Sequence, residues 1–194
     1  MRVMITGGNG GLGQVLSERF QADSYSRSNG YDIITHSDQL VKKSLDYDVF
    51  INNAYDGILG SSLAEFGQTR LLQKIALSWK QHDKTGHIIN VGGIGSEDTG
   101  PPFPGWESYN SNKRALKHLS LQWTQAFRQN QVRFRTSLLT IDRLDTPKGR
   151  SLPSWTGNGQ NLDDIAAMVA LCLYAAPNTC IGEIASWVNL DHKQ

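Results

Sequence analysis

Short apolar runs alternate along this chain with longer segments in which apolar residues recur every three or four positions. The first run, Val3–Ile5, has the length of a buried parallel strand and is too short for a helix. Glycines follow it, and Leu12, Leu16 and Phe20 then recur at helical spacing. The chain is therefore predicted to start with a strand, a glycine turn and a helix.

The alternation continues through the rest of the chain. Further strands are predicted at 23–28, 31–34, 49–51, 87–91 and 135–140, with a closing strand formed by 181–184 and 187–190. Further helices are predicted at 38–45, 61–80, 109–127 and 163–173, the last capped by Asp163-Asp164. Strands alternating with helices predict an α/β fold, namely a Rossmann-type doubly wound parallel sheet in a single domain covering residues 1–194.

Composition and charge exclude several classes of protein. The chain has 194 residues, 39% of them hydrophobic, which suits one globular domain with a sizeable core. Its formal net charge is +1 and it has no block of like charges, so no nucleic-acid partner is expected. No apolar run approaches the ~20 residues that span a bilayer, and the early first strand leaves no room for a signal peptide. We therefore expect no membrane association.

Cysteine and histidine usage predicts a reducing compartment and no metal site. Cys172 and Cys180 both lie in apolar surroundings, which favours two buried, reduced thiols over a disulfide and indicates a cytoplasmic location. The histidines show neither the spacing of metal ligands nor a carboxylate partner nearby in the sequence. We therefore expect no bound metal.

The glycine turn is the first candidate binding site. Glycines between a strand and a helix let the backbone approach a ligand, and the helix start presents N–H groups and a positive dipole end to a phosphate. No lysine followed by Ser or Thr comes after the glycines, which disfavours a triphosphate loop. The alternative is a glycine-rich turn without a ligand. The candidate cofactor-binding residues of this turn are Gly7, Asn9, Gly10, Gly11, Leu12 and Gly13.

The end of the second predicted strand bears on the type of dinucleotide. An acidic residue there would hold the free 2′-hydroxyl of NAD, whereas a cation would accommodate the 2′-phosphate of NADP. The strand ends in Ser26, Arg27 and Ser28, and Asp23 lies too early to be the ribose acid. The planar Arg27 guanidinium suits phosphate and adenine, although a solvated surface arginine is the plain alternative. We expect NADP(H) to be preferred over NAD(H).

Tyr109 and Lys113 are the second candidate site. Residues four apart on a helix lie on one face, so the phenol and the ammonium are expected to project into the same space. A nearby cation stabilises a tyrosinate, which predicts that the pKa of Tyr109 falls towards neutrality and makes it a usable general acid. Asn52-Asn53-Ala54 ends another predicted strand, where open α/β sheets bind ligands, although paired asparagines also suit an ordinary turn.

Together these motifs resemble the short-chain dehydrogenases/reductases, an NAD(P)-dependent family with a doubly wound sheet. The resemblance runs from Arg2 to about Val188. It depends on Thr6-Gly7…Gly11-Leu12-Gly13, Asn52-Asn53-Ala54, Ile88–Val91 and Tyr109…Lys113. It implies that Tyr109 protonates a substrate carbonyl oxygen, and that Lys113 lowers the pKa of Tyr109 and binds the nicotinamide ribose.

The resemblance implies further contacts and an assembly. The cofactor contacts that it adds are Asp32 and Ile33 on the adenine, Asn53 and Ala54 on the adenine-ribose side, and Thr146 on the nicotinamide amide. A short mobile lid over the substrate is implied at about 148–161. Family members commonly pair through two helices, so a homodimer or homotetramer is expected.

The chain departs from the family pattern where the substrate carbonyl would be polarised. Gly92 and Gly93 stand where the family usually has two serines, the second of which polarises the carbonyl. Ser96 or a backbone N–H near the glycines would have to replace it; otherwise carbonyl reduction is weak. The helix at 61–80 also lacks the asparagine of a family proton relay, and Ile141-Asp142 replaces the usual Pro-Gly.

The resulting hypothesis is an enzyme that uses NADP(H) to reduce a carbonyl group of a small soluble substrate. Tyr109 is the candidate acid, Lys113 its electrostatic partner and Ser96 the candidate polarising group. One alternative is a reductase of a nucleotide-linked sugar, which requires a larger pocket than a lid at 148–161 is expected to make. The other is a cofactor-binding sensor or subunit with little or no turnover, which the two glycines motivate.

Overall fold

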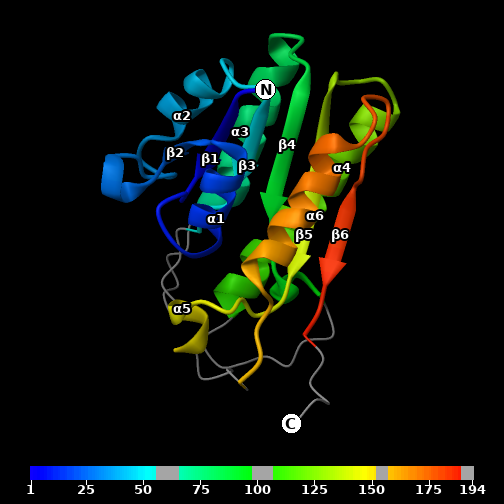
Figure 1. The fold of residues 1–194 in the computed structure, drawn as a ribbon. Helices are drawn as coiled ribbons and strands as arrows, with labels where there is room; N and C mark the ends of the chain where they lie inside the picture. Colours follow the sequence, from blue (N-terminus) through cyan, green and yellow to red (C-terminus); the bar gives the residue numbers. More distant parts are fainter. Residues whose placement is uncertain (56–65, 98–106, 152–156, 189–194) are drawn as a thin grey trace.

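The computed structural model describes residues 1–55, 66–97, 107–151 and 157–188, which form a six-stranded parallel sheet covered by helices (Figure 1). The strand order is β2-β1-β3-β4-β5-β6, and every neighbouring pair is parallel. The predicted Rossmann-type doubly wound sheet is confirmed. The strands are β1 (Val3–Thr6), β2 (Asp23–Tyr25), β3 (Val49–Asn52), β4 (Gly86–Val91), β5 (Phe134–Ile141) and β6 (Glu183–Ser186).

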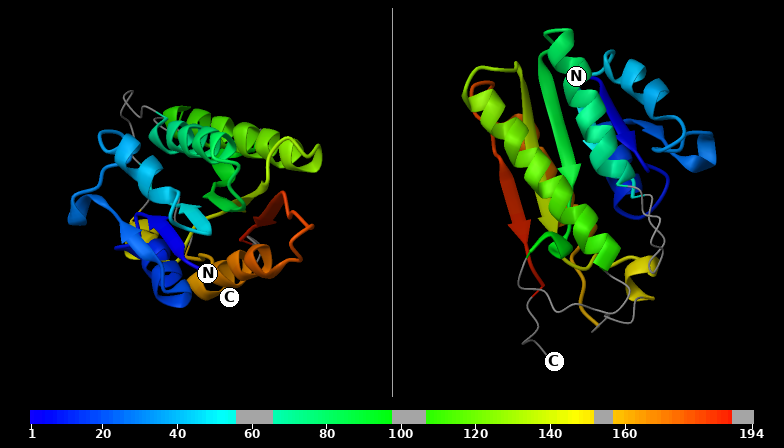
Figure 2. Two further views of the ribbon diagram at one scale, coloured as in Figure 1. Left: turned by 90° about the horizontal axis from the view of Figure 1, so that it is seen from above. Right: turned by 180° about the vertical axis from the view of Figure 1, so that it is seen from behind.

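The helices lie in two layers, one on each face of the sheet (Figure 2). One layer contains α1 (Gly11–Phe20) and α6 (Leu162–Tyr174); the other contains α2 (Ser37–Ser44), α3 (Gly67–Gln81) and α4 (Glu107–Arg128). Alternate strand residues supply the two cores, so that Ile5 packs on the α1 side and Met4 on the α3 side. Because both faces are covered, the central strands β1 and β3 are buried along their whole length and are largely apolar.

The chain reverses its winding direction at β1. From β1 it runs outward to β2, and it then returns to β3 on the other side of β1. The connections that leave the carboxyl ends of β1 and β3 therefore diverge, and the crevice between them is where open α/β sheets bind ligands. The register also places Asn52 at the end of β3 beside Asn90 on β4.

The strand predicted at 31–34 is wrong, because the side chain of Asp32 folds this segment into a turn. Asp32 Oδ1 accepts the backbone N–H groups of Ile34 at 2.8 Å and Thr35 at 3.2 Å, and the N–H of Tyr31 donates to Ser26 O at 2.9 Å. Such side-chain acceptors compete with a strand ladder. The apolar Ile33 of this turn is buried in the core on the α3 side, which accounts for its apolar side chain without a strand.

Several predicted boundaries shift. Within the described residues the helix predicted at 61–80 begins at Gly67, and its first residues, 61–65, lie outside them. The closing strand covers only Glu183–Ser186; Trp187 after it is exposed, and 189–190 lie outside the described residues. The cap of α6 is Asn161, whose Oδ1 accepts the N–H of Asp163 at 2.8 Å, so the predicted aspartate pair forms the first helical turn instead.

Both cysteine thiols are free, but their burial differs from the prediction. Cys172 is buried in the core beside α1, whereas Cys180 is only partly buried.

None of the helices in the described part of the chain has the length and apolar content needed to cross a bilayer. The centre of the predicted lid, 152–156, lies outside the described residues, and a short helix, α5 (Pro147–Arg150), begins the lid segment.

Candidate active site

The glycine turn joins β1 to α1 and is tightly packed. Gly7 has φ +70°, a conformation that favours glycine, and its N–H donates to Tyr25 O at 2.9 Å. Gly13 has no room for a side chain, because a Cβ there would run into Gly7 O and would lie 2.8 Å from Asn53 Nδ2. Gly10, the N-cap of α1, makes no side-chain cap, so the N–H groups of the first turn are available to an anion.

Asn53 fixes this turn from the neighbouring strand. Its Nδ2 donates to Thr6 O and to Gly7 O, both at 3.1 Å. The backbone N–H groups of Asn53 and Ala54 both donate to Thr6 Oγ1 at 3.2 Å. Asn53 therefore fixes the conformation of the glycine turn, in addition to the cofactor contact that the resemblance implies.

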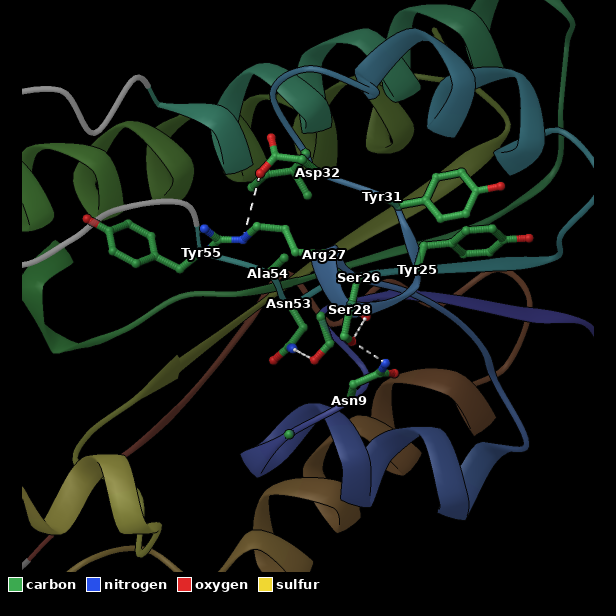
Figure 3. A pocket seen from close by; sticks show the side chains of 13 residues that line it. Asn9, Tyr25, Ser26, Arg27, Ser28, Tyr31, Asp32, Asn53, Ala54 and Tyr55 are labelled. Atoms are coloured by element: carbon green, nitrogen blue, oxygen red, sulfur yellow. Dashed lines mark hydrogen bonds and ion pairs between the residues drawn. The ribbon is translucent and has the colours of Figure 1, made fainter.

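A cavity of about 380 Å³ opens beside this turn, at the carboxyl ends of β1, β2 and β3 (Figure 3). Most of the predicted cofactor-binding residues line it, and they come from all three connections that leave these strands. The lining residues are Gly7, Asn9, Gly10, Tyr25, Ser26, Arg27, Ser28, Tyr31, Asp32, Ile33, Asn53, Ala54 and Tyr55. The sequence predicted most of this set and missed Tyr25, Tyr31 and Tyr55.

Six predicted cofactor residues lie outside the cavity lining: Gly11, Leu12, Gly13, Tyr109, Lys113 and Thr146. Leu12 is buried in the core, so only its backbone faces the turn. Gly11 begins α1 with φ +50°, and a Cβ on it would lie 3.6 Å from the Thr146 methyl group, so Thr146 adjoins the start of α1. Thr146 also caps α5, because its Oγ1 accepts the N–H of Gly149 at 2.9 Å.

Hydroxyl and amide groups gather on one side of the cavity. Asn9 Nδ2 donates to Ser28 Oγ at 2.6 Å, Ser24 Oγ donates to Asn9 Oδ1 at 2.7 Å, and the hydroxyls of Ser26 and Ser28 are 3.0 Å apart. This chain of polar side chains links the glycine turn to the end of β2. It offers donors to a phosphate and contains no carboxylate.

The Arg27 side chain extends away from these hydroxyls and is paired with Asp32 (Figure 3). The distance from Arg27 Nε to Asp32 Oδ2 is 3.7 Å, and the Arg27 side chain is 68% exposed. Its remaining guanidinium donors thus stay accessible to a ligand. Asp23, in contrast, accepts the Tyr47 hydroxyl at 2.7 Å and does not line the cavity.

Tyr109 and Lys113 project from one face of α4, as predicted, and meet Tyr55. The rings of Tyr55 and Tyr109 pack edge to face with centroids 5.3 Å apart. Lys113 Nζ lies 5.6 Å from the Tyr109 ring centroid and 5.3 Å from the Tyr55 ring centroid. Lys113 is only 4% exposed, so its charge is held in a largely dry environment.

Gln68 binds the Lys113 ammonium and was missed by the sequence analysis. Its Oε1 accepts Lys113 Nζ at 2.9 Å, while its Nε2 donates to Asn52 O at 2.7 Å and to Val91 O at 3.0 Å. Lys113 Nζ also donates to Val91 O at 3.1 Å. One signal was present: Gln68 lies one helical turn before Leu71 and Leu72, so it is a polar residue on the apolar face of α3.

The pKa of Tyr109 shifts in the opposite direction to the prediction. Burial raises the pKa of the phenol, and the nearby Tyr55 phenol and Asp142 carboxylate raise it further. The net shift is upward, so burial and these two groups outweigh any stabilisation of the phenolate by the Lys113 ammonium. Tyr109 is thus protonated at neutral pH, which is the state that a proton donor requires.

The Tyr109 hydroxyl lies against Gly93, whereas Ser96 is hydrogen-bonded to Glu97. A Cβ on Gly93 would lie 2.5 Å from the Tyr109 hydroxyl, so the phenol occupies the space of that side chain. Ser96 is buried, and its Oγ donates to Glu97 Oε1 at 3.3 Å. Glu97 in turn binds Lys117 Nζ at 2.6 Å, and Lys117 also binds Glu183 at 3.0 Å. Ser96 is therefore tied to an ion-pair network between α4 and β6.

Within the described ranges, His, Cys, Asp and Glu form no group that could hold a metal ion.

No protein-family model matches the sequence, and no match is found among curated proteins. Many solved structures match the fold.

Three of these structures show what the fold is similar to. A 3-ketoacyl-(acyl-carrier-protein) reductase from Brucella melitensis, complexed with NADH, has a TM-score of 0.72, 20% identity and 95% coverage of both chains. A metagenomic short-chain oxidoreductase in complex with NADP has a TM-score of 0.68 and 22% identity over 96% of both chains. A gluconate 5-dehydrogenase from Burkholderia cenocepacia with NADP and tartrate has a TM-score of 0.69 and 16% identity, covering 97% of this chain and 93% of that one. The chain therefore has the fold of the short-chain dehydrogenases/reductases, the family that its motifs resemble.

Proposed function

We propose that this protein is an oxidoreductase that uses NADP(H) to reduce a carbonyl group of a small soluble substrate. The observation that supports it is the continuity of two sites along one edge of the sheet. Tyr55 lines the cavity that also contains Gly7 and Arg27, and its ring contacts Tyr109 and Lys113. A dinucleotide extending from the cavity past Tyr55 would therefore reach a phenol and an ammonium.

The residues present fit such a cofactor. The turn from Gly7 to Gly13 leaves no space for a Cβ at Gly13, and the first turn of α1 has no side-chain cap, as a pyrophosphate cradle requires. Ile33 and Ala54 would hold the adenosine, and Lys113 would bind the nicotinamide ribose. When bound, the nicotinamide supplies the hydride.

The preference for NADP(H) rests on the groups around the end of β2. Arg27 presents an exposed guanidinium, and Ser26, Ser28 and Asn9 present hydroxyl and amide donors to the same cavity. Phosphate binds such a set through charge-assisted hydrogen bonds. The nearby carboxylate, Asp32, accepts two backbone N–H groups and pairs with Arg27, so it is engaged in the turn.

In the proposed reaction, Tyr109 Oη donates its proton to the carbonyl oxygen of the substrate as the carbonyl carbon is reduced. The raised pKa keeps this proton on the phenol until the substrate oxygen becomes basic. Lys113 then stabilises the phenolate electrostatically, because its ammonium lies close to the Tyr109 ring in a site of low exposure. Gln68 keeps the ammonium in place.

Two groups remain candidates for polarising the substrate carbonyl. Ser96 would first have to give up its hydrogen bond to Glu97. The alternative is a backbone N–H near Gly92 and Gly93. Replacement of Ser96 by alanine distinguishes them, because lost turnover would assign the role to the hydroxyl and retained turnover would assign it to the backbone.

We further propose that the protein acts in the cytoplasm as a homodimer or homotetramer. The free thiols of Cys172 and Cys180 support a reducing compartment. Sedimentation of the purified chain decides the oligomeric state.

A cofactor-binding sensor with little turnover is the second candidate. The observation that favours it is the absence of side-chain donors at Gly92 and Gly93. It predicts tight nucleotide binding without reaction.

The test is calorimetric titration with NADPH and NADH, followed by turnover of a panel of aldehydes and ketones measured by nicotinamide absorbance. We expect tight NADPH binding and a turnover that Tyr109→Phe abolishes. The matched control is Tyr174→Phe, because Tyr174 lies on α6 and is 74% exposed. Binding without turnover would favour the sensor, and failure to bind either nucleotide would refute both.

A further inference from the structure

Tyr55 occupies a position between the cavity and the residues proposed to transfer the proton. It follows Asn53 and Ala54 at the carboxyl end of β3, and its side chain extends away from Tyr25 and Tyr31 on the other side of the cavity (Figure 3). The same ring lines the cavity and touches both Tyr109 and Lys113. None of the motifs that predicted the site includes this residue.

The ring faces of two tyrosines flank the Lys113 ammonium. The nitrogen lies 5.3 Å from the Tyr55 centroid and 5.6 Å from the Tyr109 centroid, and the two rings are inclined at 79°. Both distances are within the range of cation–π attraction, which is strongest where the cation is shielded from water. Lys113 is 4% exposed, so this condition is met.

The ammonium also donates hydrogen bonds to two buried residues. Gln68 Oε1 on α3 and Val91 O at the end of β4 accept its hydrogens at 2.9 and 3.1 Å. Tyr55 is the member of this set that also borders the cavity. Removal of its ring would open a path for water from the cavity to Lys113, and water weakens the attraction between the ammonium and a phenolate.

We propose that Tyr55 is a positioning residue for proton transfer: its ring shields the Lys113 ammonium from the water of the cavity and holds it against the Tyr109 phenol. This inference rests on the proposed function of Tyr109 and Lys113. Both contacts are made by the ring, so phenylalanine fulfils the role and alanine does not. Tyr55 itself exchanges no proton with the substrate.

The experiment compares Tyr55→Phe and Tyr55→Ala with the wild type in two assays. In the first, kcat and the Kd for NADPH are measured. We expect Tyr55→Ala to lower kcat, measured at saturating NADPH, by about tenfold or more, and Tyr55→Phe to retain at least half of kcat. An unchanged kcat in Tyr55→Ala, or an equal loss in Tyr55→Phe, would overturn the proposal.

The second assay needs neither cofactor nor turnover. Hydrogen exchange of the Lys113 ammonium is followed by nitrogen-correlated NMR, with the signal assigned by its loss in Lys113→Met. We expect exchange to be about tenfold faster or more in Tyr55→Ala and near the wild-type rate in Tyr55→Phe. The matched control is Tyr31→Ala, which removes a partly buried tyrosine from the other side of the cavity and should leave this exchange unchanged.

The two assays separate failure of this inference from failure of the proposed function. A wild type that turns over no carbonyl would contradict the function, while the exchange rates would still show whether Tyr55 shields Lys113. Equal exchange in the wild type and Tyr55→Ala would overturn the inference even if the enzyme reduces carbonyls. Thermal unfolding of each variant establishes that it is folded.

Discussion

The hydroxyl of Tyr109 lies over Gly93, on the side of that residue where a side chain would project. The family pattern would place a carbonyl-polarising serine at this position, and here the space is filled by the phenol. Glycine at 93 is therefore a steric requirement of the observed Tyr109 position. The phenol reaches across the end of β4 because no Cβ stands in its way.

Gly93→Ala is expected to displace the Tyr109 hydroxyl, because a Cβ would lie only 2.5 Å from it. The far end of the phenol can move, so the protein should still fold. Misplacement by about 1 Å is enough to lower kcat roughly 100-fold, while the Kd for NADPH changes little. Steady-state kinetics and calorimetry measure the two quantities. A gain of activity in Gly93→Ser would contradict the steric interpretation, since serine adds the same Cβ.

Arg27→Ala is expected to weaken NADPH binding by about 10- to 100-fold and NADH binding by less than about threefold, since a charge-assisted hydrogen bond acts on the 2′-phosphate alone. Calorimetric titration with both nucleotides gives the ratio. Arg133→Ala is the control, because Arg133 is also exposed but pairs with Asp83. An equal loss for NADPH and NADH would remove the basis for the NADP(H) preference.

Gln68→Leu is expected to lower both stability and kcat. The substitution removes the acceptor of Lys113 Nζ and the donors to Asn52 O and Val91 O, all of which are buried. Unpaired buried groups of this kind cost about 2–4 kcal/mol in the free energy of unfolding. Denaturant unfolding and kcat measure the two effects. The control is Gln125→Leu, at an exposed site on α4, which should change the free energy of unfolding by less than about 0.5 kcal/mol.

His87 is expected to make the fold less stable as the pH is lowered. Burial and the nearby Arg135 lower its pKa from 6.5 to about 3. Ser137 Oγ donates to Ile181 O, so His87 Nε2 carries the hydrogen shared with Ser137. Among the described residues the buried Nδ1 has no hydrogen-bond partner, so an N–H formed there by protonation would lack an acceptor.

Protonation of His87 favours the unfolded chain, because the pKa of this histidine is lower in the folded state. Between pH 6.5 and about 3 the unfolded chain binds a proton at this histidine and the folded chain does not, so stability falls by up to about 5 kcal/mol across that window. Denaturant unfolding between about pH 7 and pH 4 should therefore show a shallower pH dependence in His87→Leu than in the wild type. His118→Gln, at an exposed site, should keep the wild-type slope; identical slopes in all three proteins would contradict the assignment.

The sequence predicted the parts of the fold and site that depend on neighbours along the chain. The glycine turn and the Tyr109–Lys113 spacing are local patterns that lie where they were expected. Ser26, Arg27 and Ser28 line the cavity as expected, but the predicted strand at 23–28 ends at Tyr25 and Arg27–Asn29 form a short 3-10 helix. The turn at 31–34 was missed because its apolar residues form no strand, Ile33 being buried and Ile34 exposed, and the side chain of Asp32 decides the backbone conformation.

The electrostatic state of Tyr109 could not be predicted, because it depends on contacts between distant segments. The Lys113 ammonium donates a hydrogen bond to Gln68, which is 45 positions away in the sequence. Burial raises the pKa of Tyr109, and Tyr55 and Asp142, which raise it further, follow the ends of β3 and β5. Spacing along one helix places the phenol and the ammonium on one face, but it does not determine which atoms the ammonium binds.

All residues that line the cavity fall between Gly7 and Tyr55, whereas the proton donor and its cation lie on α4, after residue 106. The groups proposed to discriminate between the nucleotides, Arg27 and its neighbours at the end of β2, thus lie in an earlier stretch of the chain than the candidate proton donor. A chimera that exchanges only residues 23–32 for the corresponding segment of another protein with this sheet is expected to change the choice of coenzyme and to leave Tyr55, Tyr109 and Lys113 in place. The two properties can therefore diverge independently during evolution.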